Sequence, residues 1–150
     1  MTIKKLGLIG GGQLAQMLAQ AAEPLDIEIQ CWVDNLDCPA KNNAWLATGD
    51  TPEDFTHWLE GLDALTFEFE NVDTASLEKA NLPLFPSVEI IKIAQDRDLE
   101  KNFFREQSIP TTPFSIVSSL QECREKIIEM GFPVIVKTCR DGYDGKGQIL

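Results

Sequence analysis

A glycine-rich stretch, "CRDGYDGKGQ", follows Lys137 near the end of the 150-residue sequence. Glycine lets the backbone approach a ligand closely, and backbone amides beside a lysine suit a phosphate. Lys137 ends the apolar run "PVIVK", where an ammonium group needs an anionic partner unless its side chain reaches water. The stretch is not a Walker A loop, because Gly147 leads into "QIL", which favours a strand rather than a helix. We predict a hairpin that lies over the phosphates of a nucleotide. An ordinary hairpin turn is the alternative, since Asp-Gly pairs are common in such turns.

A second glycine cluster, Gly10 to Gly12, stands between an expected strand and an expected helix. With Ala15 it completes the pattern G-x-G-x-x-A, and Asp34 ends the next expected strand, as in dinucleotide-binding proteins. Glycines at such a turn let an anion approach the N-terminus of the helix. Three interpretations stay open: NAD binding, binding of another phosphate, and a purely structural turn.

Two carboxylates stand in the stretch "TFEFENV". Glu68 and Glu70 alternate with Phe67 and Phe69, so that a strand through this stretch would carry both acids on one face. They lie at its carboxyl end, where doubly wound sheets bind their ligands. The alternative is a strand that simply emerges into solvent.

The hydrophobic pattern predicts how these motifs are positioned. Strands are expected at 4–10, 27–33, 44–49, 63–70 and 82–87, and helices at 14–23, 51–62 and 73–80. Strand, glycine turn, helix and strand form a βαβ unit with parallel strands, so residues 1–95 are predicted to form a small, open, doubly wound α/β domain.

From residue 96 onward we expect the start of a second domain, 96–150. It would contain the end of a helical run that is broken near Asp96, a helix at 119–131, and a hairpin of strands 132–138 and 147–150. A hairpin with one helix is not a stable sheet on its own.

Composition excludes several classes of protein. The net charge of -11 argues against a nucleic-acid partner, and the longest apolar runs are too short for a membrane span or a signal peptide. The four cysteines form no CxxC pair, and the single histidine, His57, offers no partner for a zinc site. We expect free thiols in a reducing compartment, the cytoplasm.

Four stretches together resemble one enzyme family. "GGGQLAQM", "FEFENV", "AQDRDLEK" and above all "GYDGKGQ" are similar to 5-(carboxyamino)imidazole ribonucleotide synthases, which are ATP-grasp carboxylases of purine biosynthesis. The resemblance covers the whole chain in the right order. A sister family, the formate-dependent glycinamide ribonucleotide transformylases, has an acidic residue where Gln13 stands and a serine-rich loop in place of "GYDG". One departure is Ala15-Gln16, where the synthases often have Gly-Arg. If that arginine binds the substrate phosphate, this chain lacks it.

The resemblance implies a Rossmann-like pre-ATP-grasp domain followed by part of an ATP-grasp domain. The implied reaction carboxylates aminoimidazole ribonucleotide, with ATP and bicarbonate consumed through carboxyphosphate. The implied cofactors are ATP and Mg²⁺, and the implied assembly is a homodimer. In the family, the metal ligands and the adenine-binding residues lie past the position of Leu150. We therefore expect this chain to be an N-terminal fragment that is inactive alone.

Individual roles also follow from the resemblance. For ATP, the implied residues are Arg97, Lys137, Gly142, Tyr143, Asp144, Gly145, Lys146, Gly147 and Gln148. Tyr143 and Asp144 would also face the aminoimidazole substrate, where Asp144 would orient or deprotonate the amine. For substrate binding, the implied residues are Gly12, Gln13, Leu14, Glu70 and Asn71, with the turn at Gly12 receiving the ribose phosphate.

Three alternatives remain on the sequence alone. One is another ATP-grasp ligase with a different acceptor. The second is an NAD-binding Rossmann protein, which the pattern from Gly10 to Ala15 favours. The third is a noncatalytic module that senses nucleotides.

Overall fold

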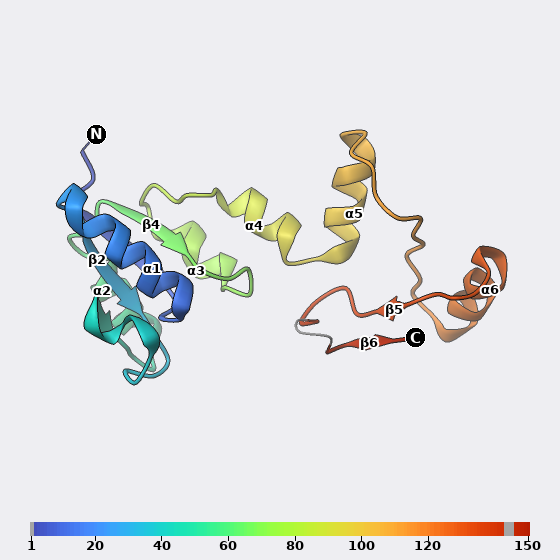
Figure 1. Ribbon diagram of the computed structural model, residues 1–150, viewed down its shortest axis with the longest axis horizontal. Helices are drawn as coiled ribbons and strands as arrows, with labels where there is room; N and C mark the ends of the chain where they lie inside the picture. Colours follow the sequence, from blue (N-terminus) through green and yellow to red (C-terminus); the bar gives the residue numbers. More distant parts are fainter. Residues whose placement is uncertain (1, 143–145) are drawn as a thin grey trace. The chain divides into compact units, whose positions relative to one another are not determined.

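The chain forms two compact units, of which the first ends at Ile91 and the second begins at Lys92. The computed structural model describes residues 2–142 and 146–150 (Figure 1). The domain boundary between residues 95 and 96 stays a prediction, since the two units divide slightly earlier, within one helix.

The first unit is built on a four-stranded parallel sheet. Its strands are β1 (Lys5–Ile9), β2 (Glu28–Trp32), β3 (Trp45–Ala47) and β4 (Ala64–Phe67), in the spatial order β3-β2-β1-β4. The strands β2 and β3 thus lie on one side of β1, and β4 pairs with the other side of β1. This strand order is that of a doubly wound sheet, as predicted, and it places the turn after β1 at the point where the direction of winding reverses.

Two helices connect strands of this sheet, α1 (Gln13–Ala22) between β1 and β2 and α2 (Pro52–Leu59) between β3 and β4. The helices α3 (Thr74–Lys79) and α4 (Val88–Ala94) follow β4, and short 3₁₀ turns lie at Glu23–Leu25 and Pro39–Asn42. The helix α2 is capped at its start: Thr51 Oγ1 accepts a hydrogen bond from the Asp54 amide, and the Thr51 amide donates to the Asp54 carboxylate. This reciprocal pair satisfies two amides that the first helical turn leaves unpaired.

The two faces of the sheet carry separate cores. One core lies on the face of the sheet against which α1 packs. Its buried residues are Leu8, Ala15, Ala19, Ala22, Ile29, Cys31, Val33 and Ala40. The other core contains Trp58, Leu62, Leu65, Leu77 and Ile91. Because side chains alternate along a strand, Leu8 packs into the first core and Ile9 against the second.

Two predicted strands differ from the structure. β4 ends at Phe67 rather than at residue 70, and the stretch 82–87 forms one isolated bridge, between Leu65 and Leu84. Pro83 and Pro86 flank that bridge and have no amide hydrogen to donate, so the ladder cannot extend.

The second unit contains α5 (Arg97–Glu106), α6 (Leu120–Met130) and an antiparallel pair, β5 (Val136–Lys137) with β6 (Gln148–Ile149). The predicted break in the helical run is confirmed, because α4 ends at Ala94 and the Asp96 side chain caps α5. The hairpin strands are shorter than predicted; Pro133, with no amide hydrogen, interrupts the first of them. In the ranges that the structure describes, no helix is long and apolar enough to cross a membrane.

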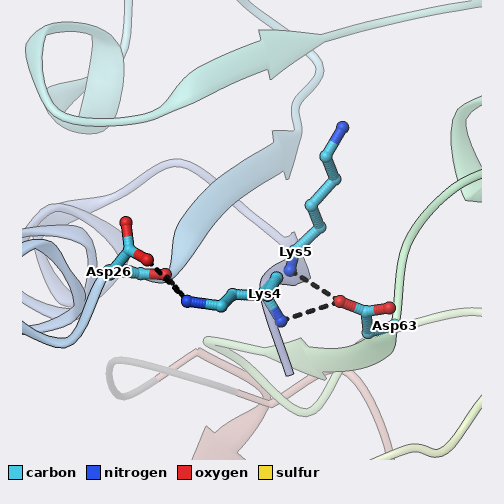
Figure 2. A network of polar contacts seen from close by, with 4 residues as sticks. All are labelled: Lys4, Lys5, Asp26 and Asp63. Carbon is cyan, nitrogen blue, oxygen red and sulfur yellow. Dashed lines mark hydrogen bonds and ion pairs between the residues drawn. The ribbon is translucent and has the colours of Figure 1, made fainter. Parts of the chain in front are cut away.

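A polar network fixes the start of β1 in the first unit (Figure 2). The amides of Lys4 and Lys5 donate to Asp63 Oδ2 over 2.7 and 2.8 Å, and the Lys4 ammonium lies 2.5 Å from Asp26 Oδ2. The two backbone hydrogen bonds hold the pKa of Asp63 below its ordinary value, and the Lys4 ammonium lowers the pKa of Asp26. Both carboxylates are therefore stabilised in their charged form by folding.

This network predicts acid sensitivity. A carboxyl pKa that is lower in the folded chain contributes stability above the unfolded pKa, near 3.8, and that contribution is lost as pH falls through the folded pKa. We expect Asp63→Asn to have a lower free energy of unfolding than the wild-type protein at neutral pH. Below about pH 4 this difference between the two proteins should become smaller. Urea unfolding across pH measures this. Asp34→Asn, which removes one exposed carboxylate after β2, is the charge control, and an equal deficit there would contradict the prediction.

Candidate functional site

The glycine turn after β1 is filled by a carboxylate of the protein itself. Glu68 directly follows β4, which pairs with β1, and its amide donates to the Ile9 carbonyl over 3.1 Å. Its side chain then accepts hydrogen bonds from the Gly12 amide (2.7 Å) and the Ala15 amide (2.9 Å). Glu68 thus satisfies two of the amides that the N-terminus of α1 leaves unpaired.

The glycines permit this close approach. Gly10 has φ +114°, a conformation that other residues rarely adopt, and a Cβ there would lie 2.5 Å from Glu68 Cγ. At Gly12 a Cβ would lie 2.8 Å from Glu68 Oε1. Among the three interpretations of this turn, these contacts favour a structural one. They argue against NAD binding, because Glu68 occupies the place that a pyrophosphate takes at such a helix.

Cys31, on β2, is buried in the core that packs against α1. Burial raises the pKa of its thiol to about 12, with smaller contributions from Cys38 and Glu68. The thiol is therefore neutral at physiological pH and serves as an apolar packing group.

The predicted substrate residues lie at the surface of the first unit. Gln13 and Leu14 are exposed in the first turn of α1, and Gly12 is half-buried. Glu70 ends the bend after β4, Asn71 directly follows it, and both are exposed.

Glu68 and Glu70 were predicted to share one strand face, and that prediction is wrong. The strand ends before Glu68, and the backbone bends at Glu68 to Glu70. Glu68 points into the glycine turn, a role that the sequence analysis missed. The pairing of Ile9 with Phe67 places the following residues, Gly10 and Glu68, side by side. This proximity follows from the order and register of the strands, which the sequence alone does not reveal.

In the second unit, Arg97 holds the base of the loop between β5 and β6. Its guanidinium donates to the Thr138 carbonyl (3.0 Å) and to the Gly142 carbonyl. Its amide donates to the Cys139 carbonyl over 2.9 Å. Since Arg97 opens α5, one residue connects this helix to three points of the loop.

A second pair of contacts supports the same loop. Arg140 Nε lies 3.0 Å from Asp96 Oδ2, and this hydrogen bond holds the pKa of Asp96 below its ordinary value. The Thr138 amide donates to the Gly147 carbonyl over 2.8 Å, which closes the loop just past the two strands.

Positive side chains accompany the loop. Lys137 lies opposite Gln148 in the strand pair, and Lys137, Arg140 and Lys146 are all exposed. Glycine backbone and three cations suit a polyphosphate. The predicted residues Tyr143, Asp144 and Gly145 lie outside the described residues.

A magnesium site is not built from the residues described. Within 2–142 and 146–150, no group of three or more His, Cys, Asp or Glu side chains could hold a metal ion. The side chains of these residues therefore do not by themselves form a Mg²⁺ site.

Family models match both parts of the chain. The ribonucleotide synthetase preATP-grasp domain matches residues 3–95. The chain belongs to this family. The ATP-grasp domain matches residues 102–150. The predicted fold class, a doubly wound pre-ATP-grasp domain followed by part of an ATP-grasp domain, is confirmed.

Individual relatives agree with this assignment. The N5-carboxyaminoimidazole ribonucleotide synthase of Staphylococcus epidermidis is 37% identical over 150 residues, which cover 97% of this chain and 40% of that protein. The structure of N5-carboxyaminoimidazole synthetase from Staphylococcus aureus complexed with ADP has a TM-score of 0.90 at 30% identity, over 97% of this chain and 40% of that one.

A further solved structure is the N5-carboxyaminoimidazole synthase of Aspergillus clavatus in complex with ADP and 5-aminoimidazole ribonucleotide. It has a TM-score of 0.80 at 26% identity, over 98% of this chain and 40% of that one. The resemblance to these synthases is confirmed, and the chain spans about 40% of their length.

Proposed function

We propose that the protein acts in purine biosynthesis as an ATP-dependent ligase that carboxylates the N5 amine of 5-aminoimidazole ribonucleotide. In this reaction bicarbonate takes the terminal phosphoryl group of ATP, giving ADP and carboxyphosphate. The amine then bonds to the carboxyl carbon, directly or after carbon dioxide is released, as phosphate leaves and the amine nitrogen loses a proton. The observation that carries the proposal is the 37% identity to a named synthase across 97% of this chain. The matches to both domain families, in order along the chain, support it.

The loop of the second unit is the proposed ATP-binding element. The Lys137 ammonium and the backbone amides from Gly142 to Gln148, with Lys146 among them, would neutralise the phosphates. Arg97 would contact ATP from the base of the loop, where its guanidinium already fixes two carbonyl groups. The solved relatives from Staphylococcus aureus and Aspergillus clavatus, which hold ADP, support nucleotide binding by this fold.

The substrate residues proposed for the first unit are Gly12, Gln13, Leu14, Glu70 and Asn71. Tyr143 and Asp144 are the proposed catalytic residues, with Asp144 orienting or deprotonating the amine. A homodimer, a magnesium ion that accompanies ATP, and a cytoplasmic location complete the proposal. The four free cysteines support a reducing compartment.

The test is ADP release by the full-length gene product with ATP, magnesium and labelled bicarbonate, with and without aminoimidazole ribonucleotide. We expect ADP release and transfer of label to the nucleotide only when that substrate is present. ADP release that ignores the substrate would leave an ATP-grasp ligase with another acceptor, and would overturn the proposed substrate.

A further inference from the structure

We propose that Glu68 is a positioning residue for the substrate turn, and that it keeps phosphate away from that turn. The carboxylate holds Gly10 to Ala15 in one conformation and supplies the negative charge that the N-terminus of α1 attracts. The turn is then left to contact an uncharged part of the substrate, the ribose hydroxyls or the aminoimidazole. This inference rests on the proposed function for the identity of the substrate.

The geometry shows a specific acceptor. Glu68 is half-buried, and its two carboxylate oxygens accept from two different amides, Gly12 over 2.7 Å and Ala15 over 2.9 Å. Hydrogen bonds to an ionised acceptor are about twice as strong as those between neutral groups. The pairing of β1 with β4 fixes the backbone position of Glu68 beside the turn. The sheet therefore determines where this carboxylate lies.

Charge at this edge of the sheet points the same way. A helix N-terminus carries a partial positive charge that an anion neutralises, and Glu68 already does so. Asp34 follows β2 at the same edge, and Glu70 follows Glu68, both exposed. A phosphate at this turn would therefore meet carboxylates and find two of its amide donors already bonded.

The side chains of the turn itself that remain accessible are neutral. Gln13 offers a side-chain amide that both donates and accepts, and Leu14, 62% exposed, offers apolar surface. Such a pair suits hydroxyl, amine and ring groups. The phosphate of the substrate must then be bound elsewhere, which revises the role first assigned to Gly12.

The first experiment observes the turn directly. With selective ¹⁵N labelling of glycine and alanine in the full-length protein, the Gly12 and Ala15 amide resonances are followed during addition of inorganic phosphate, aminoimidazole ribonucleotide and the corresponding nucleoside. We expect no response to phosphate, and equal responses to nucleotide and nucleoside at saturation. A saturable response to phosphate in the wild-type protein would overturn the proposal, and so would a response to nucleotide without one to nucleoside.

The second experiment uses Glu68→Gln, with Glu53→Gln as matched control. Glu53 is an exposed acid in the first turn of α2, so its loss also removes one charge near a helix N-terminus. We expect Glu68→Gln to move the Gly12 and Ala15 resonances and to raise KM for the nucleotide about tenfold, while KM for ATP stays unchanged. Equal rises in both KM values, or a matching effect of Glu53→Gln, would contradict a positioning role.

Together the two experiments distinguish a failure of this inference from a failure of the proposed function. If the protein uses a different acceptor, aminoimidazole ribonucleotide elicits neither turnover nor a resonance shift, and the proposed function fails. The phosphate titration and the resonances of Glu68→Gln then still decide whether Glu68 holds the turn and excludes the anion. If Glu68→Gln does not fold, the wild-type titrations decide the same point.

Discussion

Replacing Gly10 by alanine is expected to lower the free energy of unfolding of the first unit by about 3 kcal/mol. Two costs combine at this position. The backbone has φ +114°, which strains any residue with a Cβ, and the added methyl group would lie 2.5 Å from Glu68 Cγ. Relief of that clash moves the carboxylate away from the Gly12 and Ala15 amides, so two hydrogen bonds are also lost. The clash with Glu68 and the resulting loss of hydrogen bonds should cost more than the backbone strain.

Urea unfolding measures this loss, and tryptophan fluorescence is a suitable signal. Trp32 and Trp58 lie 5.6 Å apart between ring centroids, on β2 and α2, and both pack against Phe55. Gly61→Ala is the matched control, because Gly61 also has a positive φ, +83°, but a Cβ there meets nothing within 4 Å. We expect the control to lose only about 1 kcal/mol. Equal losses at the two positions would mean that Glu68 contributes nothing to the stability of the turn.

Lys137→Ala is expected to weaken ATP binding about 10- to 100-fold while it leaves folding unchanged. The ammonium group is an exposed point charge at the end of β5, beside a glycine loop whose base Arg97 and Arg140 hold. Removal of a charged hydrogen bond to phosphate costs about 1.5–3 kcal/mol, which gives the stated range. Stability should not change, since the exposed side chain contributes little to packing.

Titration of the full-length protein with ATP, together with thermal unfolding, checks both halves of this prediction. Lys126→Ala is the charge control: Lys126 lies on α6 in the same unit and pairs with Glu129 over 2.6 Å. Lys137→Arg should recover part of the affinity, because arginine keeps the charge but changes its geometry. Equal weakening by Lys126→Ala would reduce the effect to net charge, and unchanged affinity in Lys137→Ala would remove Lys137 from the proposed ATP site.

The sequence predicted the first unit well because its signals are local. The glycine turn and the periodicity of α1 each depend on residues within one turn of a helix or the adjacent strand. The break before α5 was predictable for the same reason, since Asp96 caps the helix that directly follows it. Such features depend on backbone geometry and nearby side chains, so one sequence is enough to read them.

Two features of the site depend on interactions between residues far apart in the sequence, and one of them made a prediction wrong. Glu68 looked like part of a strand because the Phe-Glu alternation continues past Phe67, but its hydrogen bonds to Gly12 and Ala15, more than fifty residues away, pull it into the turn. The contact of Arg97 with ATP stays a prediction, and the structure adds hydrogen bonds from Arg97 to the carbonyls of Thr138 and Gly142. Neither contact follows from periodicity, because each requires the order and register of strands far apart in sequence.

The isolated bridge at Leu84 has a consequence for the behaviour of the protein in concentrated solution. The Leu65 amide donates to the Pro83 carbonyl over 2.8 Å, and the Phe85 amide donates to the Leu65 carbonyl over 3.0 Å. An edge strand with unpaired amides and carbonyls can form hydrogen bonds with a strand of another chain, which leads to aggregation. Here the backbone of Leu65 is already paired, and the prolines at 83 and 86 prevent the covering segment from offering a continuous edge of its own. This one bridge thus blocks the addition of a foreign strand at Leu65, within the β4 edge of the sheet.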